Sequence, residues 1–161
     1  MPILAIDPGN TESAYVEIDD NLKPVKFGKV KNDDLLYIIR SSHTDYVVIE
    51  MVASYGMPVG KDVFETCVWI GRFWQMAVWC ALSVETVTRN EVKNHICHSS
   101  KAKDSNIRRE LIDKFAKHDF KNGKGTTKNP DWFHGFHDDI WQSYALAVVY
   151  HDLHISEVSP C

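Results

Sequence analysis

The chain alternates short apolar runs with one-sided amphipathic segments, a pattern typical of a mixed α/β domain. Two runs, residues 2–7 and 46–50, are apolar almost without interruption, as expected of strands buried on both faces. Three further segments, at 13–18, 25–30 and 84–88, also have strand composition. Turn residues separate the first three strands, which are therefore expected to form an antiparallel meander.

Apolar side chains at helical spacing predict five helices between and after these strands. Their expected bounds are 32–40, 61–82, 91–97, 104–117 and a last helix from 138 or 139 to 152. The helix 61–82 carries so many apolar side chains that it is either deeply buried or lies at a subunit interface. The stretch 118–131, rich in Gly, Lys, Asn and Thr, is expected to be mobile.

The order of these elements is that of a ribonuclease H-like α/β fold. We expect a five-stranded mixed sheet flanked by helices, with the strand 2–7 at its centre and the strand 46–50 beside it in parallel. The 161 residues suffice for one such domain and are too few for two ordinary ones. Residues 1–161 are therefore expected to form a single domain.

Composition narrows the class of protein. No apolar run approaches the roughly 18 residues that span a bilayer, and the first residues lack the basic region of a signal peptide. The cysteines include no C-x-x-C pair, which favours reduced thiols and a cytoplasmic location; they are Cys67, Cys80, Cys97 and Cys161. The spacing of His and Cys residues also fits no usual zinc module.

Three carboxylates lie where apolar segments end or begin. Asp7 follows the first apolar run, Glu50 closes the fourth strand, and Asp139 opens the last helix. The expected fold brings the three together, and converging carboxylates repel one another unless a cation lies between them. Oxygen ligands favour Mg²⁺ or Mn²⁺, so the pattern predicts a metal-dependent site for phosphate chemistry. Taken singly, each residue has a plainer role as a turn, strand-end or helix-terminus charge.

The charge distribution adds nucleic acid as a candidate partner. The net charge of −4 and the pI near 6.0 disfavour a simple nucleic-acid binder, whose domain is usually basic. Residues 81–130, however, contain eleven Lys/Arg against six Asp/Glu, so this stretch carries +5 and the remainder −9. A local basic stretch is compatible with a DNA-facing surface. The alternative is that these charges only solvate one helix and a loop.

Four motifs in order resemble those of RuvC-type Holliday-junction resolvases and extend over nearly the whole chain. They lie at 3–9, 47–50, 100–107 and 139–147, and the phrase at 55–60 resembles the phage-like branch. The resemblance implies an endodeoxyribonuclease that resolves four-way DNA junctions by paired nicks, using two Mg²⁺ (or Mn²⁺) ions per site. For a phage-encoded chain it also implies the cytoplasm of a bacterial host cell.

The resemblance makes the three carboxylates catalytic residues and metal ligands. The family usually has two acids three residues apart on the last helix, and here Gln142 stands three residues after Asp139. An amide oxygen can coordinate a metal but carries no charge. Either three acids suffice, or Asp138 or His137 substitutes, with Asp138 held in reserve behind Asp139.

Several residues are expected to contact DNA. Lys103, with Lys101 next, is the candidate cation for charge that builds on the phosphoryl oxygens, and Arg108 is a further contact. The loop after Glu50 carries Tyr55 and Met57, either of which could wedge between bases at the branch point. The alternatives are solvation of the lysines and packing of Tyr55 on its own loop.

A four-way junction has two-fold symmetry, and a C₂ homodimer supplies two matched sites. The apolar helix 61–82 is the expected interface, although part of its face must belong to the core. Its large aromatic residues are Trp69, Phe73, Trp74 and Trp79.

Other functions stay open at this point. A related nuclease could cut RNA or flap and fork DNA, and a non-catalytic junction-binding module would explain Gln142 as a sign of decay. The stretch 7–11 also resembles the phosphate loop of sugar kinases and related ATPases. Those proteins need a second, duplicated domain, for which 161 residues leave no room.

Overall fold

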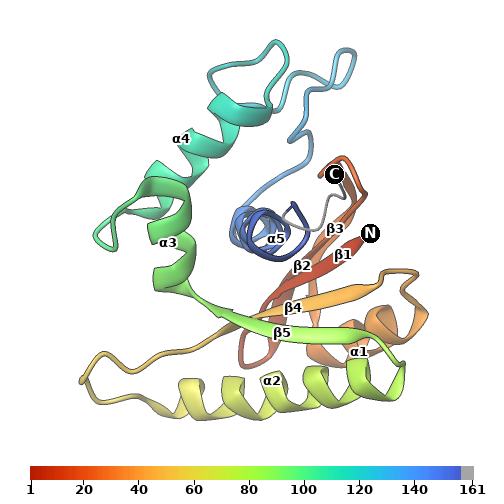
Figure 1. The fold of residues 1–161 in the computed structure, drawn as a ribbon, viewed down its shortest axis with the longest axis vertical. Coiled ribbons are helices and arrows are strands. Elements are labelled where there is room, and N and C mark those ends of the chain that lie inside the picture. Colours follow the sequence, from red (N-terminus) through yellow and green to blue (C-terminus); the bar gives the residue numbers. More distant parts are fainter. Residues whose placement is uncertain (157–161) are drawn as a thin grey trace.

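A single mixed sheet of five strands organises the computed structural model, which describes residues 1–156. Its strand order is β3-β2-β1-β4-β5, with β1–β3 antiparallel and β4 and β5 added in parallel (Figure 1). The strands are β1 (Ile3–Asp7), β2 (Glu12–Ile18), β3 (Pro24–Lys31), β4 (Tyr46–Met51) and β5 (Ser83–Thr88). The central β1 and the parallel β4 confirm the predicted ribonuclease H-like architecture.

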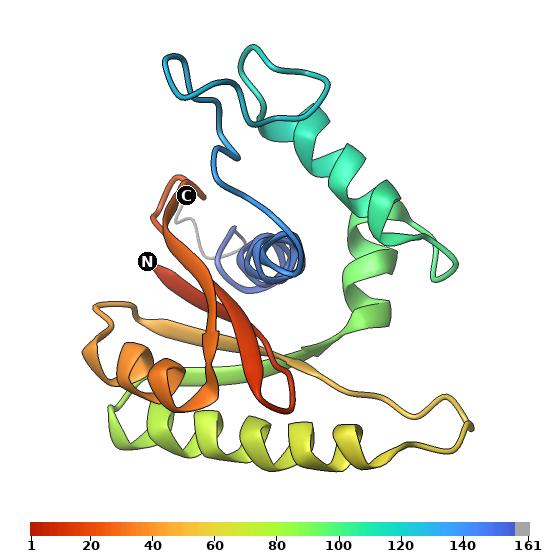
Figure 2. The ribbon, with the colours of Figure 1, turned by 180° about the vertical axis from the view of Figure 1, so that it is seen from behind.

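Helices cover both faces of this sheet. They are α1 (Asn32–Ser41), α2 (Lys61–Trp79), α3 (Arg89–Cys97), α4 (Asp104–Phe115) and α5 (Ile140–His154). α1 and α2 pack on one face and α5 crosses the other, with α3 and α4 beyond it (Figures 1 and 2). No helix within residues 1–156 is both long and apolar enough to cross a membrane. Cys161 lies outside the described residues.

The continuous apolar run of β1 follows from burial on both faces. Ile3 and Ala5 belong to the core on the α5 side, whereas Leu4 and Ile6 belong to the core under α1 and α2. α5 is enclosed almost all round, because every residue from 140 to 150 is buried. A helix that is apolar on all sides is expected in such a position.

Helix ends differ from the sequence prediction in several places, and α5 runs from Ile140 to His154 rather than from 138 or 139 to 152. α2 ends at Trp79 rather than at residue 82, because Ala81 has a left-handed φ of 58° and ends the helix. α3 starts at Arg89, two residues early, because Thr88 and Glu91 form a capping box. α4 ends at Phe115 rather than at residue 117, since the next residue has left the helical conformation.

The stretch after α4 is folded rather than mobile. The Asp131 carboxylate is buried and accepts backbone N–H groups of Lys117, His118, Asp119 and Trp132 at 2.7–3.1 Å. Asp119 in turn accepts three N–H groups of residues 122–125. We call residues 117–134, held by these two side chains, the clasped segment. Composition predicted mobility because it does not reveal that these carboxylates replace water as hydrogen-bond partners.

Candidate active site

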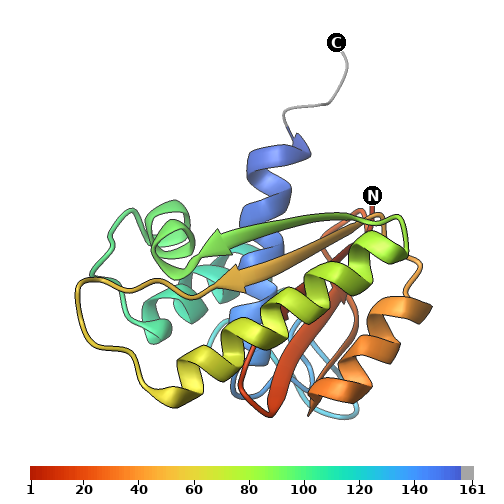
Figure 3. The same cartoon turned by 90° about the horizontal axis from the view of Figure 1, so that it is seen from below.

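Three carboxylates lie at one end of the sheet. β1 and β4 pair in parallel with Ile6 opposite Ile49, so Asp7 and Glu50 follow at the same edge. α5 crosses β1, and Asp139 is its N-cap residue. Figure 3 shows that α5 starts at the end of the sheet where β1 stops. The structure thus brings all three predicted acids to one edge.

Asp7 carries the electrostatic strain of this arrangement. Burial raises the pKa of its carboxyl, and the negative charges of Glu50 and Asp139 raise it further, to about 8. The positive charges of Arg89 and Lys29 oppose the rise only in part. The carboxyl of Asp7 therefore lacks a sufficient countercharge, which is the condition expected of a ligand for a cation.

Lys29 supplies one countercharge. Across the sheet Asp7 pairs with Ala14, which pairs with Lys29, so the register places this lysine at the site. Its Nζ donates a hydrogen bond to Asp139 Oδ2 at 2.7 Å, and that bond raises the pKa of Lys29. A cavity of about 310 Å³ opens here, and its lining includes Asp7, Asp139, Lys29 and the β1–β2 turn.

Arg89 supplies the other countercharge. It follows β5, whose parallel pairing with β4 places Val87 opposite Glu50. Its guanidinium lies 3.4 Å from Glu50 Oε2 and also pairs with Asp104 at the start of α4. Burial raises the pKa of Glu50, and Arg89 opposes that rise. This network connects the carboxylate edge to α4.

The oxygen ligands at this edge are of the kind that a hard divalent cation binds, although they are not grouped around one point. Within residues 1–156 no three His, Cys, Asp or Glu side chains are grouped closely enough to hold a metal. Gln142 Oε1, one turn after Asp139, is buried and has no hydrogen-bond partner among those residues. An acceptor that lacks a donor can take a cation or a water bound to it. Carboxylate and amide oxygens are Mg²⁺-type ligands, so the residues fit such an ion.

Asp138, the reserve ligand, is exposed, and its negative charge contributes to the raised pKa of Lys29. Its backbone has a φ of 42°, and its exposed carboxylate lies 3.1 Å from His137 Nδ1. Neither side chain is among those lining the cavity at Asp7. Gln142 does not line that cavity either, but its buried and unpartnered Oε1 distinguishes it from these two exposed side chains.

The other predicted contact residues are exposed. Lys101 and Lys103 are exposed, and Lys103 is the N-cap residue of α4, next to the Asp104 that pairs with Arg89. Tyr55 and Met57 are 59% and 72% exposed on the loop between β4 and α2. Arg108 lies over the Trp141 ring, at the start of α5.

Sequence reasoning did not single out Lys29 and Arg89. Arg89 had a usable signal, because it directly follows the predicted strand 84–88, which the structure places beside Glu50. No local sequence pattern identifies Lys29, because only the register of β1, β2 and β3 places it beside Asp7.

Comparisons with known proteins agree with the architecture. The amino-acid sequence matches no protein-family model and no curated protein. The fold is similar to the solved Thermus thermophilus RuvC structure, with a TM-score of 0.67 and 12% identity over 95% of this chain and 96% of that one. It is also similar to T. thermophilus RuvC in complex with Holliday junction substrate, with a TM-score of 0.68 and 15% identity over 93% and 92%. At these identities the likeness establishes the fold, and the chain has a RuvC-like ribonuclease H fold.

Proposed function

We propose that this protein is a metal-dependent endonuclease that cuts four-way DNA junctions by paired, symmetric nicks. The observation that carries the proposal is the carboxylate edge of a RuvC-like fold, where Asp7 lies between Glu50 and Asp139 with its pKa raised to about 8. The similar fold of T. thermophilus RuvC with a Holliday junction substrate supports the choice of DNA substrate.

Asp7, Glu50, Asp139 and Gln142 would hold the metal. When bound, divalent ions stabilise the attacking and leaving oxygens of a phosphodiester and activate water. Lys29 forms an ion pair with Asp139, and Arg89 forms one with Glu50, so these two cations would position the carboxylates for the ion. Lys103 and Lys101 would add positive charge for the phosphoryl oxygens.

The test compares a synthetic four-way junction with a linear duplex of the same sequence, each incubated with protein and Mg²⁺ or Mn²⁺. Paired nicks across the branch point, absent from the linear duplex and abolished by a chelator, are expected. Cutting of RNA hybrids or flaps in preference to junctions would instead assign a related nuclease. Absence of cutting on every substrate, at protein concentrations that bind the junction, would contradict the nuclease.

A second candidate, a junction-binding protein without nuclease activity, is favoured by one observation. Lys29 already pairs with Asp139, and Arg89 already pairs with Glu50. Within residues 1–156, no three potential ligands are grouped closely enough to hold a metal. Such a protein would bind junctions equally well with Mg²⁺ or with chelator and leave them uncut, so the same experiment separates the two functions.

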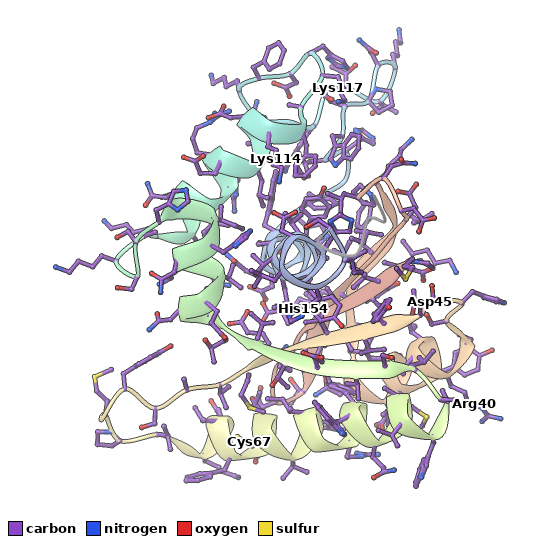
Figure 4. The ribbon with its side chains drawn as sticks, viewed as in Figure 1. Arg40, Asp45, Cys67, Lys114, Lys117 and His154 are labelled. Carbon is purple, nitrogen blue, oxygen red and sulfur yellow. The ribbon has the colours of Figure 1, made fainter. Side chains whose placement is uncertain are left out.

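We infer a homodimer that meets through the outer face of α2. Phe73, with Ile70 and Ala77, forms the buried face of this helix, so part of the predicted interface is core. The opposite face exposes an apolar stripe without charge. Its members are Phe64, Cys67, Val68, Gly71, Trp74 and Val78, with Trp79 beside it (Cys67 is labelled in Figure 4). A second copy suits this stripe because two symmetric nicks need two sites.

Val68→Glu is expected to dissociate this dimer. The C₂ axis would bring two such carboxylates into one apolar interface, and about 3 kcal/mol of destabilisation corresponds to roughly 100-fold weaker association. Sedimentation velocity against Tyr37→Glu, which alters an equally exposed apolar residue on α1, measures the effect. A variant that sediments like the wild type would place the interface elsewhere.

A further inference from the structure

A cavity of about 370 Å³ lies between α4, the start of α5 and the clasped segment. Its lining includes Arg108 from α4, Trp141 from α5, and Asp119, Lys121 and Lys124 from the clasped segment. It is separate from the cavity at Asp7, because the two share no lining residue. Trp141 is nevertheless only two residues beyond Asp139, so the two cavities flank the start of α5.

The clasped segment is built to hold its lysines in place. Asp119 Oδ1 accepts the N–H of Asn122 at 3.0 Å, and Oδ2 accepts the N–H groups of Lys124 and Gly125 at 3.2 and 2.9 Å. Gly123 has a φ of +72°, and a Cβ there would lie 2.7 Å from the Phe133 ring. The backbone that carries the lysines is therefore fixed by hydrogen bonds on one side and by core packing on the other.

Arg109 joins the same segment to α4. Its guanidinium pairs with Asp113 at 2.8 Å and donates to the carbonyl oxygens of Phe120 and Lys121 at 2.6 and 3.2 Å. Arg108, its neighbour, is instead directed to the cavity and lies 5.1 Å from the centre of the Trp141 ring. Arg109 therefore holds the loop against α4, whereas Arg108 lines the cavity and can contact a ligand there.

The cavity has an excess of positive charge. Arg108, Lys121 and Lys124 form no salt bridge with any carboxylate in the part of the chain that the structure describes. The carboxylate that does line the cavity, Asp119, is engaged by backbone N–H groups, and these lower its pKa. Three cations and a single carboxylate leave the cavity with a net positive charge, which favours an anionic ligand.

We propose that this cavity binds a backbone phosphate of a DNA arm that flanks the cleaved position. The inference rests on the proposed function and names a part of the substrate that the carboxylate edge does not contact. Phe120, 62% exposed beside Lys121, adds an apolar surface for sugar or base. The basic stretch of the sequence thus becomes a defined site, in which Arg108, Lys121 and Lys124 contact phosphate.

The test uses the double variant Lys121→Gln/Lys124→Gln and the control Lys128→Gln, which removes a charge from the same segment outside the cavity. The clasped segment begins at Lys117, shortly after Lys114 near the end of α4, and both lysines are labelled in Figure 4. Fluorescence anisotropy measures binding to a four-way junction and to a plain duplex over a salt series. Loss of two phosphate contacts should weaken binding roughly tenfold and reduce the slope of log K against log salt by about 2.

The outcomes separate the cavity from the proposed function. If the wild type cuts junctions and the double variant binds both DNAs as tightly as the control, the cavity is not a phosphate site and the function stands. If the wild type cuts nothing, yet binds both DNAs through Lys121 and Lys124, the cavity is upheld and the nuclease is not. A wild type that binds neither DNA overturns both.

Discussion

Asp7→Asn is expected to abolish DNA cleavage, by roughly three orders of magnitude or more, while DNA binding persists. Asp7 lies between Glu50 and Asp139, and neither Lys29 nor Arg89 pairs with it directly. The amide keeps the shape of the side chain but cannot offer two anionic oxygens to a cation. The rate of junction nicking in Mg²⁺ and the affinity for the same junction measure the two effects.

Asp45→Asn is the matched control for this variant. Asp45 precedes β4 at the edge of the sheet opposite Glu50 and is exposed (Figure 4). The Asp45→Asn variant should cut and bind the junction as the wild type does. Substantial nicking by Asp7→Asn would place the reacting centre away from this edge, and a loss of affinity equal to the loss of cleavage would make Asp7 a binding residue only.

Asp7 and Glu50 could be predicted from the sequence because each interrupts a run that burial on both faces keeps apolar. A carboxylate at the end of such a run has one position available, the edge of the sheet. Asp139 required the additional assumption that the last helix crosses β1. Lys29 could not be predicted in this way, because its place depends on the register of three strands, which a local pattern does not fix.

The two faces of α2 show a different limit. Helical periodicity identified an apolar stripe, but apolar residues occur on both sides of this helix. Phe73 is buried against the sheet, whereas Trp74 and Trp79 are 38% and 75% exposed. Periodicity gives the angle between side chains and not the direction of the core, so the buried face becomes known only from packing.

The clasped segment shows how composition misleads. Gly, Asn, Lys and Thr are typical of mobile loops, yet Asp119 and Asp131 hold this one through backbone N–H groups. Asp is equally common in solvated turns, so its identity does not disclose the partner. The same segment supplies the cations proposed to contact DNA, and its order therefore bears on function.

Asp131→Asn is expected to lower the free energy of unfolding by about 3 kcal/mol at neutral pH, because its amide presents a donor to backbone N–H groups that need an acceptor. For a domain of this size that corresponds to a melting temperature roughly 10 °C lower. Burial raises the pKa of Asp131, but the N–H groups of His118, Asp119, Lys117 and Trp132 outweigh it and hold the pKa well below its usual range.

This depressed pKa determines the pH dependence. The stabilisation by ionised Asp131 is fully present above the pKa of the unfolded chain, about 3.9, and is lost as pH falls towards the folded value. The wild type and Asp131→Asn should therefore differ most at pH 6–7 and converge below about pH 4. Thermal melts at a series of pH values, with Asp45→Asn as control, measure this. A difference that stayed constant down to pH 2 would mean that the Asp131 charge does not hold the clasped segment.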